Sequence, residues 1–141
     1  MQWLRFWNAP AIFGEWGCRW FDGEFIGYIG SKPAAVSRFV RNPIPSKLEI
    51  TADDYQLKPD GQDATRVVFR IVDQVGNLLP YINDFIQISL EGPGKIIGPE
   101  QTAFIGGSIA SWVKAGEKTG AIRLKAKSSR LASEQIEILV K

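Results

Sequence analysis

The sequence of 141 residues contains no histidine and only one cysteine, Cys18. Without histidine, the chain has neither the base of Ser-His-Asp and Cys-His catalysis nor the imidazole ligands of many zinc sites. A single cysteine excludes a disulfide within the chain. Because no histidine is present to activate its thiol, we interpret Cys18 as a buried, inert side chain rather than a nucleophile.

Excess charge of one sign and long hydrophobic runs are missing as well. The formal net charge is +2, which is too small to predict binding to nucleic acid or to an anionic membrane surface. No apolar run reaches the roughly 18 residues of a transmembrane helix. The N-terminus lacks the features of a secretory signal peptide. We therefore expect no nucleic acid and no membrane as partners, and a reducing, cytoplasmic setting is favoured.

Aromatic residues are abundant but unevenly placed, since ten of the 16 lie in residues 1–45. The segment Arg41-Asn-Pro-Ile-Pro-Ser46 has two prolines, which hold the residues before them extended and so predict a short, stiff linker. We therefore divide the chain into an aromatic-rich β segment with its linker, residues 1–45, and a complete domain, residues 46–141. Because two strands alone are marginal in water, we expect residues 1–45 to be the tail of a preceding domain in a larger protein.

Residues 46–141 show the pattern of an all-β domain. Apolar and polar residues alternate in segments 47–51, 65–72, 85–90, 121–126 and 134–140, with shorter candidate strands at 96–97, 103–105 and 109–113. Turn residues separate these segments every 8–15 residues, as in an antiparallel β-sandwich. In the first part, residues 18–30 and 34–40 are expected to form two further strands.

Carboxylates are the first candidates for chemistry. Glu15 and Glu24 lie among aromatic residues, and glycoside hydrolysis needs two carboxylates about 5–10 Å apart. Both segments are typical of turns, however, so we favour a structural role. A second group of acidic residues could suggest calcium but does not match the spacing of an EF-hand loop, so these are interpreted as solvated turn residues: Asp53, Asp54, Asp60 and Asp63.

Two further motifs have a structural and a functional interpretation. Gly92-Pro-Gly-Lys-Ile-Ile-Gly98 resembles a phosphate-binding loop, but its glycine spacing is wrong and no helical pattern follows, so a turn between strands is favoured. Arg123, Lys125 and Lys127 form a basic stripe along one strand face. The stripe could attract an anionic ligand, but it would also guard a sheet surface against aggregation, which we favour.

The tryptophans Trp3, Trp7, Trp16 and Trp20 are the candidate contact residues of the chain. Their rings could form a platform on which sugar rings stack. Alternatively they fill a core or an interface whose neighbour is missing, because so large an apolar patch is rarely exposed in a monomer. We favour the second interpretation and keep carbohydrate as an alternative partner.

Several of these segments, taken in order, resemble a known bacterial domain. Pro45-Ser-Lys-Leu-Glu-Ile-Thr-Ala-Asp-Asp54 and Leu57-Lys-Pro-Asp-Gly-Gln-Asp-Ala-Thr-Arg66 resemble the start of the immunoglobulin-like domain that closes many family 2 glycoside hydrolases, the β-galactosidase group. Val67-Val-Phe-Arg-Ile-Val-Asp-Gln-Val-Gly-Asn77 is similar to the V-x-D-x-x-G-N strand and turn of that domain. Upstream, Gly27-Tyr-Ile-Gly-Ser-Lys-Pro-Ala-Ala-Val-Ser-Arg38 is similar to the last hairpin of the domain before it.

The resemblance implies an immunoglobulin-like β-sandwich without catalytic residues, since the catalytic glutamates of these enzymes belong to a barrel that no segment here matches. We expect no cofactor and no metal. The implied partners are the missing catalytic and neighbouring domains of a bacterial parent enzyme, and the implied role is to brace the catalytic module or contribute to an interface. The alternatives are a carbohydrate-binding module and an adhesion-type immunoglobulin-like repeat.

Overall fold

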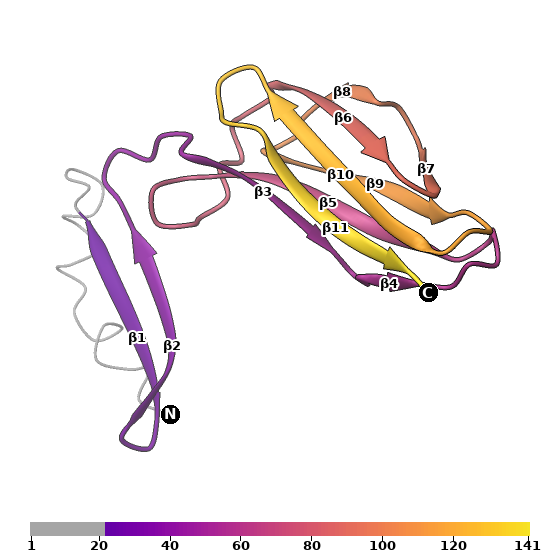
Figure 1. Ribbon diagram of the computed structural model, residues 1–141. Coiled ribbons are helices and arrows are strands. Elements are labelled where there is room, and N and C mark those ends of the chain that lie inside the picture. The colour runs from indigo at the N-terminus through magenta and orange to yellow at the C-terminus, as the bar shows by residue number, and fades with distance from the viewer. Residues whose placement is uncertain (1–21) are drawn as a thin grey trace, which may run out of the picture. The chain divides into compact units, whose positions relative to one another are not determined.

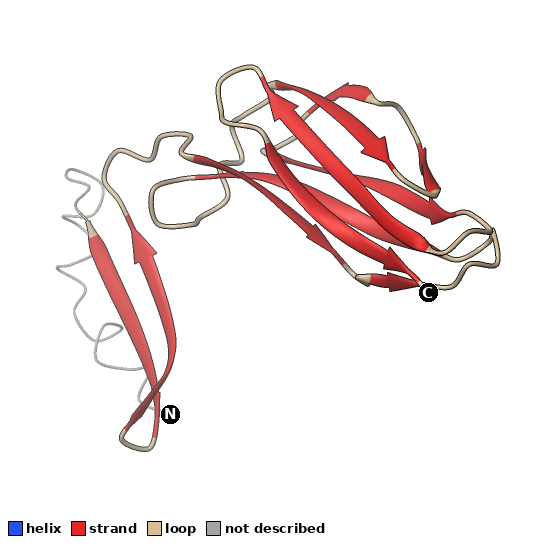
Figure 2. Cartoon of the chain, in the orientation of Figure 1, coloured by secondary structure: helices blue, strands red, loops and turns tan. Residues whose placement is uncertain are grey.

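The computed structural model describes residues 22–141 (Figure 1). Every regular element of this part is a β-strand (Figure 2), and it contains no helix long and apolar enough to cross a membrane. The chain divides between Pro43 and Ile44 into two compact units. Each unit is described by itself.

The first unit contains an antiparallel hairpin of β1 (Gly23–Ile29) and β2 (Lys32–Phe39). The turn between them uses Gly30 at φ 63°, a left-handed conformation that glycine adopts at little cost. Phe25 and Phe39 meet edge to face across the strands, with their ring centroids 5.7 Å apart. The hairpin predicted from the sequence is thus present, although its second strand begins at residue 32 rather than 34.

The second unit is a sandwich of two sheets. The four-stranded sheet has the order β3-β5-β9-β7, and the five-stranded sheet has the order β4-β11-β10-β6-β8. The neighbouring strands pair antiparallel, except that β4 pairs parallel to β11. The all-β, immunoglobulin-like sandwich expected from the sequence is confirmed. The strands are β3 (Lys47–Ala52), β4 (Gln56–Leu57), β5 (Ala64–Val72), β6 (Phe85–Glu91), β7 (Gly94–Ile97), β8 (Gln101–Ala103), β9 (Ser108–Ala115), β10 (Gly120–Ser128) and β11 (Glu134–Val140).

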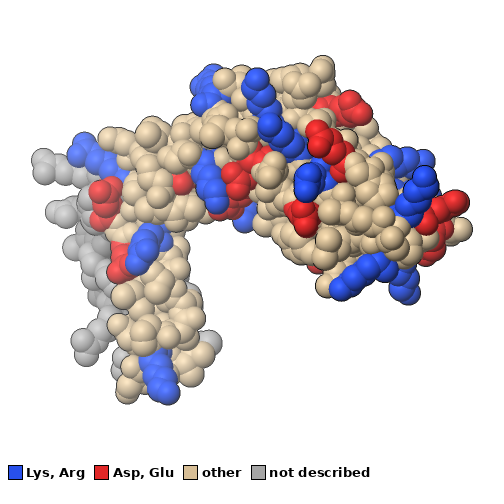
Figure 3. All heavy atoms as spheres, in the orientation of Figure 1, with Lys and Arg blue, Asp and Glu red and all other residues tan. Residues whose placement is uncertain are grey.

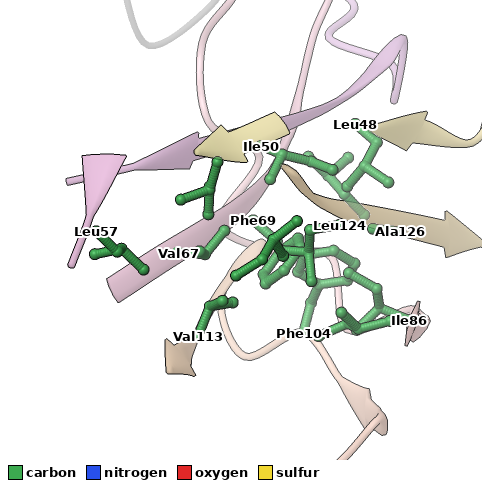
Figure 4. Close-up of a cluster of buried hydrophobic side chains, with 14 of the residues drawn as sticks. Leu48, Ile50, Leu57, Val67, Phe69, Ile86, Phe104, Val113, Leu124 and Ala126 are labelled. Carbon is green, nitrogen blue, oxygen red and sulfur yellow. The ribbon is translucent and has the colours of Figure 1, made fainter. Parts of the chain in front are cut away.

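The core lies between the two sheets and follows the period-2 alternation of the strands. On β5 the side chains of Val67, Phe69 and Ile71 are fully buried. On β10, Leu124 and Ala126 are equally inaccessible and come from the opposite sheet (Figure 4). Burying a valine, leucine, isoleucine or phenylalanine side chain contributes about 1.5–3 kcal/mol. The alternation predicted for these strands is therefore confirmed, with its apolar residues facing the core.

The segment around residue 104 differs from the prediction. Residues 103–105 were expected to form a strand, but β8 ends at Ala103. Phe104 instead turns into the core, where it is 1% exposed. Ile105 begins a tight turn through Gly106 and Gly107, whose φ angles are 64° and 76°. Two successive positive φ angles define a type I′ turn, which requires glycine or asparagine and ends the strand earlier than apolar patterning suggests.

Candidate interaction surfaces

The residues that the sequence singled out as contacts lie outside the described part of the chain. Trp3, Trp7, Trp16 and Trp20 all fall within residues 1–21, as do Glu15 and Cys18. The core or interface role of the tryptophans, with the sugar platform as its alternative, the structural role of Glu15 and the inert state of the thiol therefore remain predictions. The candidate surfaces below are built from residues 22–141.

The remaining predicted glutamate, Glu24, lies on the hairpin and forms an ion pair with Arg38, with Oε1 2.6 Å from Nε. Asp53, one of the acidic residues considered for calcium, is likewise paired: its carboxylate accepts from Nε and Nη2 of Arg66 at 3.0 and 3.3 Å. These carboxylates are therefore occupied by cations of the same chain. In residues 22–141, no three histidine, cysteine, aspartate or glutamate side chains gather as metal ligands would.

Two other aspartates hold the loop between β4 and β5. Oδ1 of Asp60 accepts the backbone N–H groups of Gln62 and Asp63, each at 2.8 Å. These hydrogen bonds favour the charged carboxylate and hold the pKa of Asp60 below its usual value. Asp63 in turn accepts the backbone N–H of Lys58 at 2.8 Å. The interpretation of both residues as turn formers fits this geometry.

The predicted basic stripe is present on the outer face of β10. Arg123 and Glu137 of β11 are paired across the strands, with Nε 3.5 Å from Oε2. Lys125 lies between Ser89 of β6 and Gln135 of β11 in the register of the sheet. In the view of Figure 3, basic and acidic side chains alternate over the sandwich without a broad area of one sign. This mixture favours a solvated sheet surface over a site for an anion.

The segment 92–98, which resembles a phosphate-binding loop, begins with the turn between β6 and β7, as favoured from the sequence, and continues as β7 itself. β6 ends at Glu91 and β7 begins at Gly94. At Gly92, φ is 113° and a Cβ atom would lie 2.3 Å from the backbone oxygen of Ala121, so only glycine fits. A shallow pocket of about 490 Å³ lies beside it. Its lining combines three glycines, three charged residues, a proline and an alanine: Gly61, Pro93, Gly94, Lys95, Ala115, Gly116, Glu117 and Lys118.

Trp112 lies on the outer face of the four-stranded sheet and is 50% exposed. In the register of the sheet it lies opposite Arg66 on β5 and Ile97 on β7. Ile97 is also about half exposed, whereas the guanidinium of Arg66 is held by Asp53. This small apolar surface is separate from the larger one described next.

Exposed apolar side chains of the sandwich concentrate at the end where the linker joins it. Six of its ten exposed large hydrophobic residues lie there: Ile44, Val75, Leu78, Tyr81, Phe85 and Ile105. We call the four that lie in loops, Val75, Leu78, Tyr81 and Ile105, the apolar tip. The first three belong to the loop between β5 and β6, and Ile105 to the turn between β8 and β9.

The backbone beneath the apolar tip is firmly held. In the β5–β6 loop, Leu79 and Ile82 are buried, while Leu78 and Tyr81 point outward, at 39% and 56% exposed. The two loops are joined because the N–H of Gly107 donates to the carbonyl of Ile82 at 2.8 Å. The apolar tip is therefore a set of exposed side chains on a fixed backbone, rather than a pair of loose loops. No pattern of local sequence identifies it, because valine, leucine and isoleucine also fill the core.

Comparison with known proteins places this sandwich in a family. Residues 48–137 match the model for glycoside hydrolase family 2 C-terminal domain 5. A β-galactosidase of Rhizobium radiobacter is 39% identical over 124 residues, which are 88% of this chain and 90% of that protein. A β-galactosidase of Thermoanaerobacterium thermosulfurigenes is 43% identical over 99 residues, 70% of this chain but 14% of that protein.

Among solved structures, a glycosyl hydrolase family 2 member from Bacteroides cellulosilyticus has the same fold, with a TM-score of 0.71 at 21% identity. The superposition covers 84% of this chain and 17% of that protein. The chain thus spans a small part of most of these proteins, with further domains implied in the parent protein. On the match to residues 48–137 and these similarities, the chain belongs to the glycoside hydrolase family 2 C-terminal domain 5 family.

Proposed function

We propose that this chain is a non-catalytic accessory region of a β-galactosidase-like glycoside hydrolase, which braces the catalytic module or contributes to an interface between domains. The family match and the β-galactosidase relatives support a glycoside hydrolase parent. The chain matches only 14% of the Thermoanaerobacterium thermosulfurigenes enzyme, so the residues that break the glycosidic bond are assigned to the rest of the parent.

The observation that carries the proposal is what the carboxylates of the described residues do. A glycosidase needs two carboxyl groups that flank the scissile bond, one of them free to protonate the leaving oxygen. Here Glu24, Asp53 and Glu137 each pair with an arginine, while Asp60 and Asp73 accept backbone N–H groups in turns. Each of these five carboxylates is therefore engaged by a partner in the same chain.

The proposal is tested on the 141-residue chain and on a relative. We expect the chain to show no hydrolysis of a chromogenic β-galactoside above that of a mock purification from the same host. In the Thermoanaerobacterium thermosulfurigenes enzyme, deletion of the matching segment should leave the catalytic residues intact but speed thermal inactivation. Turnover by the chain alone, or a deletion without effect on stability or activity, would contradict the accessory role.

The carbohydrate-binding alternative makes a different prediction for the same sample. If the tryptophans formed a sugar platform, titration with galactosides or polysaccharides would quench or shift the tryptophan fluorescence in a saturable way. Under the accessory role, we expect the emission spectrum to be unchanged across the titration.

A further inference from the structure

We propose that the Asp22–Gly23 step, at the start of β1, is a modification site at which the folded chain converts aspartate to isoaspartate. The sequence contains one other Asp–Gly step, Asp60–Gly61, and no Asn–Gly step. Glycine favours this conversion because it has no side chain to shield its backbone nitrogen. The two steps are therefore alike in sequence, and their different surroundings in the fold decide which of them reacts.

The conversion takes place within the chain and needs only water as a further reactant. The backbone nitrogen of Gly23 bonds to the side-chain carboxyl carbon of Asp22, and the N–H hydrogen leaves together with the carboxyl hydroxyl as water. Water then opens this cyclic imide by breaking the bond between the nitrogen and the backbone carbonyl carbon of Asp22. The chain afterwards runs through the side-chain carbon, which lengthens the backbone by a methylene group and leaves a carboxylate at the former backbone carbonyl.

The carboxylate of Asp60 is restrained by the loop between β4 and β5. Its Oδ1 accepts the N–H groups of Gln62 and Asp63, each at 2.8 Å, so rotating the carboxyl toward the nitrogen of Gly61 disturbs both hydrogen bonds. The same bonds lower the pKa of Asp60 and favour the charged form. Because ring closure expels water from the protonated carboxyl, both effects slow the reaction at this step.

The backbone of the same loop is fixed as well. The N–H of Lys58 donates to Oδ2 of Asp63 at 2.8 Å, and the N–H of Ala115 donates to the carbonyl of Asp63 at 2.8 Å. The side chain of Glu117 lies over Gly61, since a Cβ atom at Gly61 would be 3.2 Å from its Cγ. Ring closure here therefore requires an opening of the loop that breaks several contacts with the sandwich.

Asp22, by contrast, lies at the end of a small hairpin. Its Oδ1 accepts the N–H of Arg41 at 2.6 Å, and the paired strand β2 is exposed at every residue. A hairpin of two strands is marginally stable, so its ends open at a low cost in free energy. Each opening releases the carboxyl of Asp22 for ring closure. The isoaspartate that forms displaces the acceptor of the Arg41 N–H, so the start of β1 loses this hydrogen bond.

The test follows isoaspartate in the 141-residue chain by peptide mapping with electron-transfer fragmentation, during incubation in mildly acidic buffer below the unfolding temperature. The same chain unfolded in urea gives the rate of each step without the fold, and the ratio of the two rates is the protection. Protection at Asp60 should exceed that at Asp22 by at least about tenfold, which corresponds to about 1.4 kcal/mol. Equal protection at both steps, or isoaspartate at residue 22 in the unfolded chain alone, would overturn the assignment.

Two substitutions test whether the loop provides the protection. Asp63→Ala removes the acceptor of the Lys58 N–H and should raise the rate at Asp60, while the rate at Asp22 stays unchanged. Asp54→Ala is the matched control, because it removes an exposed carboxylate outside this loop and should change neither rate. Thermal unfolding of both variants sets a temperature at which they are folded. A rise at Asp60 in both variants, or in neither, would contradict the role of the loop, and the comparison of the two steps in the unmodified chain requires neither variant.

Discussion

Asp73 and Asn77 are connected by hydrogen bonds that involve both their backbones and their side chains. Oδ1 of Asp73 accepts the backbone N–H of Asn77 at 2.8 Å, and Oδ2 accepts from Nδ2 of Asn77 at 3.2 Å. In return, the N–H of Asp73 donates to the carbonyl of Asn77 at 2.9 Å. Oδ1 also accepts the N–H of Val75 at 2.9 Å, so one buried carboxylate fixes the start of the loop that bears the apolar tip.

Asp73→Ala should therefore destabilise the sandwich by about 2–4 kcal/mol, because several backbone and side-chain donors lose a charged acceptor at a buried position. Asp73→Asn, which keeps one carbonyl acceptor, should cost less. Urea unfolding followed by circular dichroism measures both values. Equal stability of the alanine variant and the unmodified chain would show that this turn contributes nothing to the fold.

Gly107 and Gly76 provide a matched pair of substitutions. Both have positive φ, 76° and 90°, but a Cβ at Gly107 would lie 2.1 Å from the carbonyl oxygen of Leu79, whereas nothing lies within 4 Å at Gly76. Gly76→Ala should cost about 1–2 kcal/mol, the strain of a left-handed backbone. Gly107→Ala should cost clearly more and disturb the junction of the two loops, as measured by thermal unfolding. If both variants lost the same stability, the structure would accommodate the Cβ atom of residue 107 beside the Leu79 carbonyl oxygen without a further loss of stability.

Phe104 and Ile105 are adjacent in the chain but opposite in environment, at 1% and 79% exposed. Phe104→Ala should destabilise the 141-residue chain by about 3–5 kcal/mol, because it leaves a cavity in the core. Ile105→Ala should change the stability by less than about 0.5 kcal/mol. Thermal and urea unfolding of the two variants provides the comparison. A large loss at Ile105 would mean that its side chain supports the sandwich and not an external contact.

The stabilisation that Asp60 contributes to the folded state should depend on pH in the acidic range. Its folded-state pKa lies below the usual value because the N–H groups of Gln62 and Asp63 stabilise the charged form. The resulting stabilisation is fully present above the unfolded pKa of about 3.9 and is lost as the pH falls through the lower folded pKa. In Asp60→Asn this component should disappear, so the variant should lose less stability than the unmodified chain between neutral and strongly acidic pH. An NMR titration that places the Asp60 pKa at or above the usual value would refute the coupling.

The alternation of apolar residues was sufficient to predict most of the sandwich. The last strand was expected at residues 134–140 and is found there, and the buried positions 67, 69 and 71 follow directly from a period of two. The two-residue strand β4 was missed, because so short a segment has no period. Its position depends on parallel pairing with β11, in which Val140 lies opposite Leu57, and this pairing is distant in sequence.

The apolar tip could not be predicted for a related reason. Val75, Leu78 and Ile105 are of the same types as residues that fill the core, and only the tertiary arrangement of the loops decides which side chains face outward. The predicted contact at Trp3, Trp7, Trp16 and Trp20 stays a prediction, because these residues lie outside the described part. The composition indicated which kinds of chemistry the chain lacks, but it could not indicate which apolar side chains form an exposed surface.

The pairing of β11 has a consequence for how the protein is made. Although β11 is the final strand in the chain, it lies inside its sheet, between β10 and β4, and the N–H of Lys141 donates to the carbonyl of Leu57 at 2.9 Å. During synthesis, the edges of β10 and β4 that β11 occupies stay open until residue 140 has been added. A premature stop before residue 134 would therefore release a chain in which these edges of β10 and β4 have no partner and are prone to aggregation.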